Sequence, residues 1–308
     1  MENWKRLALA ACLGAASLNL AAAADLPPAP RLPPATEPEP QFGGWYLRGD
    51  LGAGVNSTAP GLENIPDPIT TGIKSGFLST YATQAFNNTS LSPFGLIDAG
   101  VGYQFNNWFR MDGTLEYRWG ANLQSLYSLN DPASLYFAGP LQYADFYRAD
   151  LSSVVGLVNG YIDLPTFWMV TPFVGGGVGF AANSIGGFTD QGFGHTYFGP
   201  LGAAGGYFSD HVQTNFAWAL MAGLDFAIAP NLKLELGYRY LNLGRIATGG
   251  SHCLAGVSGG VFSTANCNGG VSNSIQSRST IASNDFRIGL LWTLGAPTPA
   301  PLPVIARY

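Results

Sequence analysis

The stretch Leu232-Lys-Leu-Glu-Leu-Gly-Tyr-Arg-Tyr-Leu-Asn-Leu-Gly244 decides the fold class of this chain. Its alternate residues belong to two different surfaces. One surface is apolar and becomes aromatic toward Tyr238 and Tyr240, whereas the other carries Lys233, Glu235 and Arg239. Side chains alternate between the two faces of a β-strand, so this period of two predicts a strand. A core strand of a soluble protein and a lipid-facing strand share the pattern, and the rest of the chain must distinguish them.

The composition favours an all-β chain with much of its surface turned away from water. Of 308 residues, 47% are hydrophobic and only 11% are charged, well below the roughly 25% usual for soluble domains. Glycine is abundant, with 41 residues. The net charge is −5 and no run of lysine or arginine occurs, which disfavours nucleic acid as a partner.

The first 24 residues have the pattern of a secretory signal peptide. Lys5 and Arg6 precede a largely apolar segment, and Ala22-Ala-Ala24 provides a cleavage site before Asp25. A lipoprotein box ending at Cys12 is the less favoured alternative, because the apolar segment before it is short against the ~7–15 residues of an ordinary signal. No later run approaches the ~18 apolar residues of a helical span. Any entry into a membrane therefore requires a closed barrel.

The mature chain divides into three parts. Residues 25–43 are rich in proline, which predicts an extended periplasmic tether. Residues 44–295 hold the amphipathic segments and are expected to form a barrel domain, and residues 296–308 form a second Pro-rich tail.

Eight amphipathic segments predict eight antiparallel strands. They alternate with long connections, at 57–92, 122–146, 184–214 and 247–283, and with short turns. Outer-membrane barrels have short periplasmic turns and long extracellular loops, whereas a soluble barrel has no reason to place every long loop at one end. We therefore expect an eight-stranded, up-and-down transmembrane β-barrel with four long extracellular loops. The predicted strands are Trp45–Asn56, Phe94–Phe105, Trp108–Ala121, Tyr147–Asp163, Trp168–Asn183, Asn215–Ala229, Leu232–Gly244 and Asp285–Leu294.

Aromatic residues on the apolar faces gather at the two ends of these strands. Two aromatic girdles are typical of two membrane–water interfaces. The turn end is expected to carry Trp45, Tyr103, Phe105, Phe109, Tyr161, Trp168, Phe226 and Trp292. The loop end is expected to carry Tyr117, Trp119, Phe180, Phe216, Trp218, Tyr238, Tyr240 and Phe286.

The opposite faces of the strands predict a charged interior. Eight strands enclose a space just wide enough for side chains, and burying a charge costs several kcal/mol unless it is paired. Near-equal numbers of acids and bases therefore favour a salt-bridged structural plug over a narrow water or ion path. The predicted network comprises Arg48, Asp50, Asp98, Arg110, Asp112, Glu116, Arg118, Arg148, Asp150, Asp225, Lys233, Glu235, Arg239 and Arg287.

Catalytic, cofactor-binding and metal-binding residues are not predicted. The three histidines are dispersed in the long connections, and His211 beside Asp210 is a poor catalytic pair because adjacent residues seldom act together. Cys253 and Cys267 are the two cysteines left after signal removal, and both fall in the fourth connection. In an exported protein they are expected to form a disulfide, worth roughly 3 kcal/mol for a loop of about 15 residues.

Three motifs carry a resemblance to a known family: Gly44-Trp-Tyr-Leu-Arg-Gly49, Thr171-Pro-Phe-Val-Gly-Gly-Gly-Val-Gly179 and Leu234-Glu-Leu-Gly-Tyr-Arg-Tyr-Leu-Asn-Leu-Gly244. Over residues 44–294 the chain resembles the small outer-membrane β-barrel proteins of Gram-negative bacteria, most closely the alphaproteobacterial surface-antigen (opacity-protein-like) branch. Members of that family usually end in an aromatic residue that closes the last strand. Here the Pro-rich tail follows instead and ends at Tyr308.

The resemblance implies a structural and surface-presenting role without catalysis, in which the loops act as an antigen or in adhesion. The expected partners are outer-membrane lipid and lipopolysaccharide, the barrel-assembly machinery and a surface ligand of unknown identity. The alternative function is a narrow channel or transporter for small solutes or small hydrophobic molecules. No cofactor is expected.

Overall fold

The computed structural model describes residues 44–57, 60–65, 67–196, 198–253 and 274–294. The chain separates into two compact units, and every described residue belongs to the unit that spans Pro40–Tyr308. The predicted signal peptide, the tether at 25–43, the tail at 296–308 and Cys267 lie outside the described residues. What the sequence predicts for those segments therefore stays a prediction.

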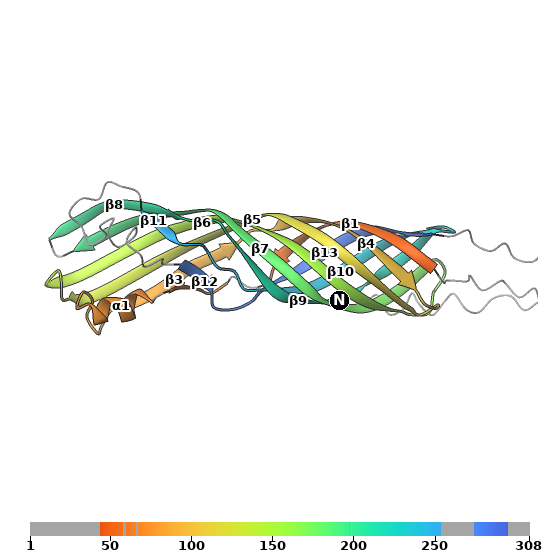
Figure 1. Ribbon diagram of the computed structural model, residues 1–308, viewed down its shortest axis with the longest axis horizontal. Coiled ribbons are helices and arrows are strands. Elements are labelled where there is room, and N and C mark those ends of the chain that lie inside the picture. Colours follow the sequence, from red (N-terminus) through yellow and green to blue (C-terminus); the bar gives the residue numbers. More distant parts are fainter. Residues whose placement is uncertain (1–43, 58–59, 66, 197, 254–273, 295–308) are drawn as a thin grey trace, which may run out of the picture. The chain divides into compact units, whose positions relative to one another are not determined.

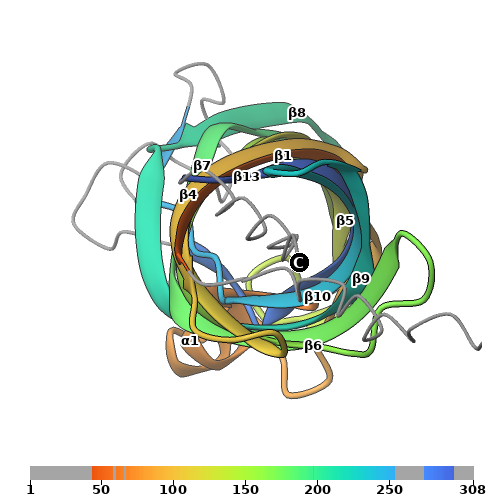
Figure 2. The ribbon, with the colours of Figure 1, turned by 90° about the vertical axis from the view of Figure 1, so that its right-hand side faces the viewer.

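Antiparallel strands pair side by side until the last meets the first and closes a ring, which Figure 2 views end-on. The pairing of β1 with β13 is the closure, and β7 pairs with β9 within the ring. The predicted all-β, antiparallel class is thereby confirmed. In ring order the strands are β1 (Gly44–Asn56), β4 (Phe94–Gln104), β5 (Phe109–Ser134), β6 (Gly139–Asp163), β7 (Val170–Thr196), β9 (His211–Ala229), β10 (Leu232–Gly244) and β13 (Ile281–Thr293).

The ring exposes apolar side chains on its outside and buries charged ones inside. On β10, Leu236 and Tyr238 are exposed, whereas Glu235 and Arg239 are buried. The neighbouring β13 continues the pattern, because register pairs Leu236 with Ile288, which is also exposed. On these two strands each face therefore has one character, which follows from the period of two along each strand.

Exposed aromatic residues gather near both ends of the outward face, as the sequence predicts for most of them. Trp45 and Trp292 are exposed at the turn end, and Tyr117 and Phe286 at the opposite end. One expectation is wrong, because Tyr161 points into the ring and is 1% exposed. Trp168 is exposed at the turn end as expected, but it lies in the turn before β7, with a φ of 60°, and not on the strand.

The assignment of faces on β6 is reversed relative to the sequence prediction. Val154, Val158 and Ile162 face outward, and the inward positions are filled by Leu151, Val155, Leu157 and Tyr161. The cause is that β6 is apolar on both faces, so its own pattern does not determine its orientation. Register with β5 does, because it pairs Asp112 with Asn159 on the inward face.

Two of the predicted long loops are wrong, because the strands continue through them. β5 and β6 form one long hairpin that turns at residues 135–138. β7 continues to Thr196 and turns back through β8 (Gly199–Phe208). These elements extend beyond the ring at the left of Figure 1.

The other two connections also contain regular structure. The first holds β2 (Leu62–Ile65), α1 (Pro68–Lys74) and β3 (Thr83–Leu91), and β3 pairs with β5. Asp67 caps α1, because its carboxylate accepts a hydrogen bond from the Ile69 amide. The fourth holds β11 (Ser251–Cys253), which pairs with β8, and β12 (Ser274–Ser277), which pairs with β2.

Polarity reverses where the strands leave the ring. On β5 the inward residues are charged up to Arg118, but beyond it they include Leu123, Tyr127 and Leu129 in an apolar core. The change follows a β-bulge at Gly120, whose φ of 86° places it in the left-handed region. Gly187 on β7, with a φ of 60°, marks a second register shift at the same level. The extension above the bulges is therefore built with its apolar side inward.

Candidate functional site

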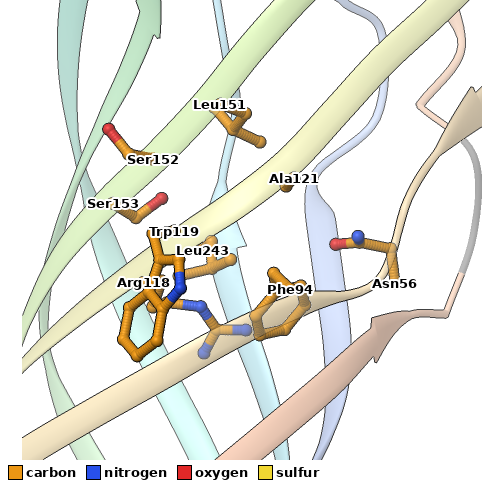
Figure 3. Close-up of a pocket in the computed structure, with 9 residues that line it drawn as sticks. All are labelled: Asn56, Phe94, Arg118, Trp119, Ala121, Leu151, Ser152, Ser153 and Leu243. Carbon is orange, nitrogen blue, oxygen red and sulfur yellow. The ribbon is translucent and has the colours of Figure 1, made fainter.

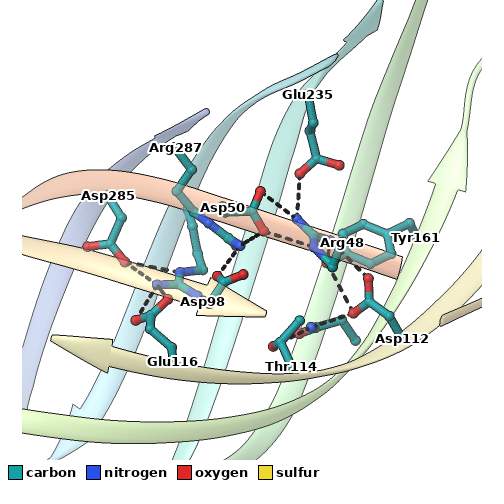
Figure 4. Close-up of polar contacts among 12 residues, drawn as sticks. Arg48, Asp50, Asp98, Asp112, Thr114, Glu116, Tyr161, Glu235, Asp285 and Arg287 are labelled. Atoms are coloured by element: carbon teal, nitrogen blue, oxygen red, sulfur yellow. Dashed lines mark hydrogen bonds and ion pairs between the residues drawn. The ribbon is translucent and has the colours of Figure 1, made fainter. Parts of the chain in front are cut away.

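The interior of the ring contains a set of buried ion pairs supplied by β1, β4, β5, β6, β9, β10 and β13. Figure 4 shows the part of this network around Arg48 and Arg287. The strand alternation brings these side chains to one face, and glycines opposite them provide the room. A side chain at Gly289, for example, would overlap the carboxylate of Asp50. The register also pairs Gly289 with Asp50 of β1 and with Glu235 of β10, so the two acids flank a position without a side chain.

Arg48 is the hub of the network near the turn end. Its guanidinium contacts Asp50 at 2.9 Å, Asp112 at 2.9 Å and Glu235 at 2.8 Å. It also donates a hydrogen bond of 2.7 Å to the hydroxyl of Tyr161. All of these side chains are buried. Arg48 thereby joins β1, β5, β6 and β10 across the inside of the ring.

Arg110 forms the layer nearest the turns. It contacts Asp163 at 3.1 Å, Asp225 at 3.2 Å and Glu235 at 3.3 Å. Its guanidinium also lies 4.7 Å from the centre of the Tyr161 ring, a favourable cation–π distance. Because Glu235 contacts both Arg110 and Arg48, these two layers form one continuous network.

A second cluster lies nearer the bulges. Arg239 contacts Glu116 at 2.6 Å and Asp285 at 2.7 Å. Arg118 contacts the same two acids, each at 3.0 Å. Two arginines and two carboxylates therefore form a closed square of opposite charges, which is the arrangement that offsets the cost of burying them.

Arg287 adds a link between neighbouring strands. It contacts Asp50 at 2.7 Å and also pairs with Asp98. The register of β1 with β4 places Asp50 and Asp98 opposite each other, and Arg287 separates their like charges. Every buried arginine inside the described ring thus has at least two acidic partners.

The structure places three of the predicted network residues differently. Arg148 and Asp150 are exposed on the outside of β6, because the faces of that strand are reversed. Lys233 is at the edge of the network, 3.8 Å from Asp225, with 15% of its side chain exposed. The remaining eleven predicted residues are brought together inside.

Two acids of the network were missed by sequence reasoning. Asp163 and Asp285 are the terminal residues of predicted strands, where the alternation has no further residue to support it. Asp285 nevertheless precedes Arg287 by two positions, so the period of two places it on the same face. Asp163 follows Tyr161 by two positions and therefore shares its face, but the sequence does not show that this face of β6 points inward.

Little space remains at the end of the network nearest the bulges. A cavity of about 10 Å³ lies beside Arg118 and Phe94, with Ser153 and Leu243 on its other sides (Figure 3). That volume accommodates about one water molecule. Arg118 stacks on the Phe94 ring at 4.1 Å, which separates the ion pairs from the apolar core above.

The outer hairpins contain a second buried polar group. Asp145 and Asp190 lie on adjacent strands and face the apolar core, where Tyr147 donates a hydrogen bond of 3.3 Å to Asp145. Burial, reinforced by the neighbouring Asp190, raises the pKa of Asp145 to about 8. Burial also raises the pKa of Asp190 to about 6. These two carboxyl groups make no ion pair with a basic side chain of the described residues.

The histidines do not form the pair that the sequence offered. His211 is exposed at the start of β9, and Asp210 instead accepts a hydrogen bond of 3.1 Å from the Gly187 amide. His252 lies 2.8 Å from the hydroxyl of Ser209 and stacks on Tyr207. No triad-forming acid contacts His252 in the described part of the chain.

Within the described ranges, no cluster of three or more His, Cys, Asp or Glu side chains is suited to a metal ion. The same ranges contain no helix that is both long and apolar enough to cross a membrane. Cys253 ends β11, and the predicted disulfide partner Cys267 is outside the described residues.

Comparisons with known proteins place this geometry in context. The family model of the outer membrane protein beta-barrel domain matches residues 8–272. An uncharacterised protein of Brucella suis is 31% identical over 67% of this chain and 70% of its own length. A putative adhesin of Rickettsia prowazekii is 28% identical over 66% of this chain and 74% of its own. Among solved structures, the outer membrane protein OprG of Pseudomonas aeruginosa matches 83% of this chain and 98% of its own, with 12% identity and a TM-score of 0.42.

Proposed function

Because this chain belongs to the outer membrane protein beta-barrel domain family, we propose that its ring spans the outer membrane as an eight-stranded barrel. The short turns lie in the periplasm and the long hairpins lie outside the cell. The observation that carries this proposal is the distribution of polarity. Exposed aliphatic side chains between two aromatic zones suit lipid, and the charged side chains are paired inside.

The reversal above the bulges supports the same proposal. An apolar outside is stable only where lipid covers it. Beyond Gly120 and Gly187 the outward residues of the described strands are mostly polar, with exposed apolar exceptions such as Phe146 and Phe193. From there an apolar core is enclosed as in a soluble protein. The bulges thus mark the outer boundary of the lipid-covered surface.

The charged interior acts as a structural plug in this proposal. Its arginines are each held by several acids, and the cavity at the end nearest the bulges has room for about one water. Conductance of refolded protein in a planar bilayer tests the plug. The expected record has no discrete openings, whereas reproducible openings would favour the channel alternative.

The biological role that we propose is surface presentation and attachment through the outer hairpins. Their tips carry exposed apolar side chains, namely Leu135 and Tyr136 between β5 and β6, and Phe198 between β7 and β8. Exposed aromatic residues on otherwise polar surfaces are frequent binding anchors. Relatives named as putative adhesins agree with this role, and no catalytic step is part of it.

Replacing the first tip tests the attachment role. The double variant Leu135→Ser/Tyr136→Ser should reduce attachment of cells to host or abiotic surfaces, because it removes an apolar anchor without changing the barrel. The control Gln142→Ala/Gln191→Ala changes two exposed polar residues on the same hairpins. Surface labelling and heat-modifiable migration must match for all variants. Equal attachment by the tip variant and the wild type would contradict the role of this tip.

A further inference from the structure

The outer wall of the ring has a groove where β5, β6 and β7 pass the two bulges. Its volume is about 370 Å³, within the range of about 300–1,000 Å³ usual for small-ligand sites. Across its floor, Ser152 pairs in register with Ser184, and Asp150 with Gly186. The lining residues are Tyr117, Trp119, Gly120, Ala121, Asp150, Leu151, Ser152, Ser184, Gly186 and Gly187.

The groove combines an aromatic wall with a polar floor. Tyr117 and Trp119 stack with ring centres 6.1 Å apart, and both are exposed. Figure 3 draws Trp119 and Ser152 among the residues of the smaller cavity, which shares them with the groove. The negative face of an aromatic ring attracts C–H groups, and hydroxyls and a carboxylate bind hydroxyl groups. A sugar ring presents both kinds of surface.

The charge of the groove selects against phosphate. Asp150 is the charged residue of the lining, and no lysine or arginine belongs to it. Asp210 adds a second carboxylate at its edge, bound to the amide of Gly187 at 3.1 Å. Arg148 lies two residues beyond Asp150 on the same face and outside the lining. An anionic head group would therefore meet like charge, whereas an uncharged sugar would not.

The position of the groove indicates that its ligand is part of a lipid. It opens sideways at the level of Tyr117 and Trp119, which belong to the outer aromatic zone, where lipid head groups meet the protein. We propose that this groove binds the uncharged sugar head group of a glycolipid in the surrounding leaflet. The inference rests on the proposed membrane location.

Native mass spectrometry tests this site with defined lipids. Wild-type protein in micelles receives equal amounts of digalactosyldiacylglycerol and phosphatidylglycerol, and it should retain mainly the galactolipid. Asp150→Ala and Trp119→Leu should each lower that retention about fivefold, as expected for losing one hydrogen bond or one aromatic contact. Equal retention of the two lipids, or unchanged retention by both variants, would overturn the proposal.

Matched variants and a separate folding check complete the design. Thr189→Ala changes an exposed hydroxyl on β7 outside the groove, and Trp292→Leu makes the Trp119 change at the opposite girdle. Both should retain the galactolipid like the wild type. Soluble digalactose offered without lipid should be retained much less than the galactolipid, and equal retention of the free sugar would overturn the lipid as its source. Heat-modifiable migration, recorded before lipid is added, separates failure of this site from failure of the membrane proposal.

Discussion

Arg239 exemplifies the energetics at the scale of single residues. Its side chain is 2% exposed and lies between Glu116 and Asp285. Replacing it by methionine, which has a similar length but no charge, leaves those acids with Arg118 as their remaining cation in the square. Removing one partner of a buried pair costs about 3–5 kcal/mol. Arg239→Met should lower the free energy of unfolding by that amount in reversible urea titrations.

Arg278 provides the matched control for that prediction. It pairs with Glu63 at 3.3 Å, but 62% of its side chain is exposed. Water already solvates both partners, so Arg278→Met should change stability by about 0–1 kcal/mol. Similar losses in the two variants would mean that the interior charges are not held in a dry network.

The carboxyl pair in the outer hairpins predicts a pH response. The pKa of Asp145 is raised to about 8, above its ordinary value of about 3.9. The folded hairpins therefore hold a proton that the unfolded chain releases. Their stability should be highest below about pH 4 and should fall as the pH rises through about 8. Hydrogen exchange of the β6 and β7 amides above the bulges, corrected for intrinsic rates, measures this decline.

The variant Asp145→Asn isolates the cause of that response. It keeps the shape of the side chain and removes its titration, so protection should decline less with pH. Asp150→Asn, on the exposed face of the same strand, should keep the response of the wild type. A wild-type hairpin whose protection does not change with pH would contradict the prediction.

Sequence reasoning identified most inward charges because their strands have one polar and one apolar face. Lys233, Glu235 and Arg239 on β10 follow directly from that alternation. The method failed for Arg148 and Asp150, because β6 is apolar on both faces and the charges near its outer end belong to the soluble-like extension. The ion-pair partners of each charge could not be predicted from the sequence. Arg48 and Glu235, for example, are far apart in sequence and meet only because the ring closes.

At the scale of elements, the bulge at Gly120 determines which side chains of β5 face inward. Its φ of 86° is a conformation that side-chain-bearing residues avoid. A Cβ added at this position would meet nothing within 4 Å, so the cost of Gly120→Ala is conformational rather than steric. We expect this variant to lose about 1–2 kcal/mol of unfolding free energy.

Gly113 on the same strand separates that conformational effect from a general effect of adding a methyl group. A Cβ at Gly113 also meets nothing within 4 Å, and its φ is not positive. Gly113→Ala should therefore be neutral or slightly stabilising in the same urea titration. Equal losses at the two positions would show that backbone strain at the bulge is not the cause.

The bulges also explain why strand lengths were underestimated. On β5 the apolar residues have odd numbers both before and after the bulge. Because the bulge inserts one residue, they face outward before it and inward after it. The insertion interrupts the period of two from which strands are predicted. Beyond the bulge the outward positions carry polar residues such as Asn122 and Gln124, which are also typical of loops. The extension of the hairpins was therefore visible only once strand pairing was known.

At the scale of the whole molecule, ring closure joins the amphipathic strands into one continuous outer surface, which the proposed function assigns to lipid. The pairings of β1 with β13 and of β7 with β9 leave no unpaired edge within the described ring, which a bilayer requires because it has no water to satisfy free backbone groups. The sequence predicted this architecture from alternation and from one-sided long connections. The sequence did not predict the level at which the apolar outer surface ends, because that level is set by the bulges.

Thiol accessibility in intact cells tests the membrane-spanning arrangement most directly. Single cysteines at Tyr136, Leu236 and Asn107, in a background with Cys253→Ser and Cys267→Ser, probe the hairpin tip, the lipid-facing wall and a short turn. A membrane-impermeant maleimide should label Tyr136→Cys on intact cells, Asn107→Cys only after the outer membrane is permeabilised, and Leu236→Cys in neither case. Labelling of Asn107→Cys on intact cells, or of Leu236→Cys in folded protein, would contradict the account.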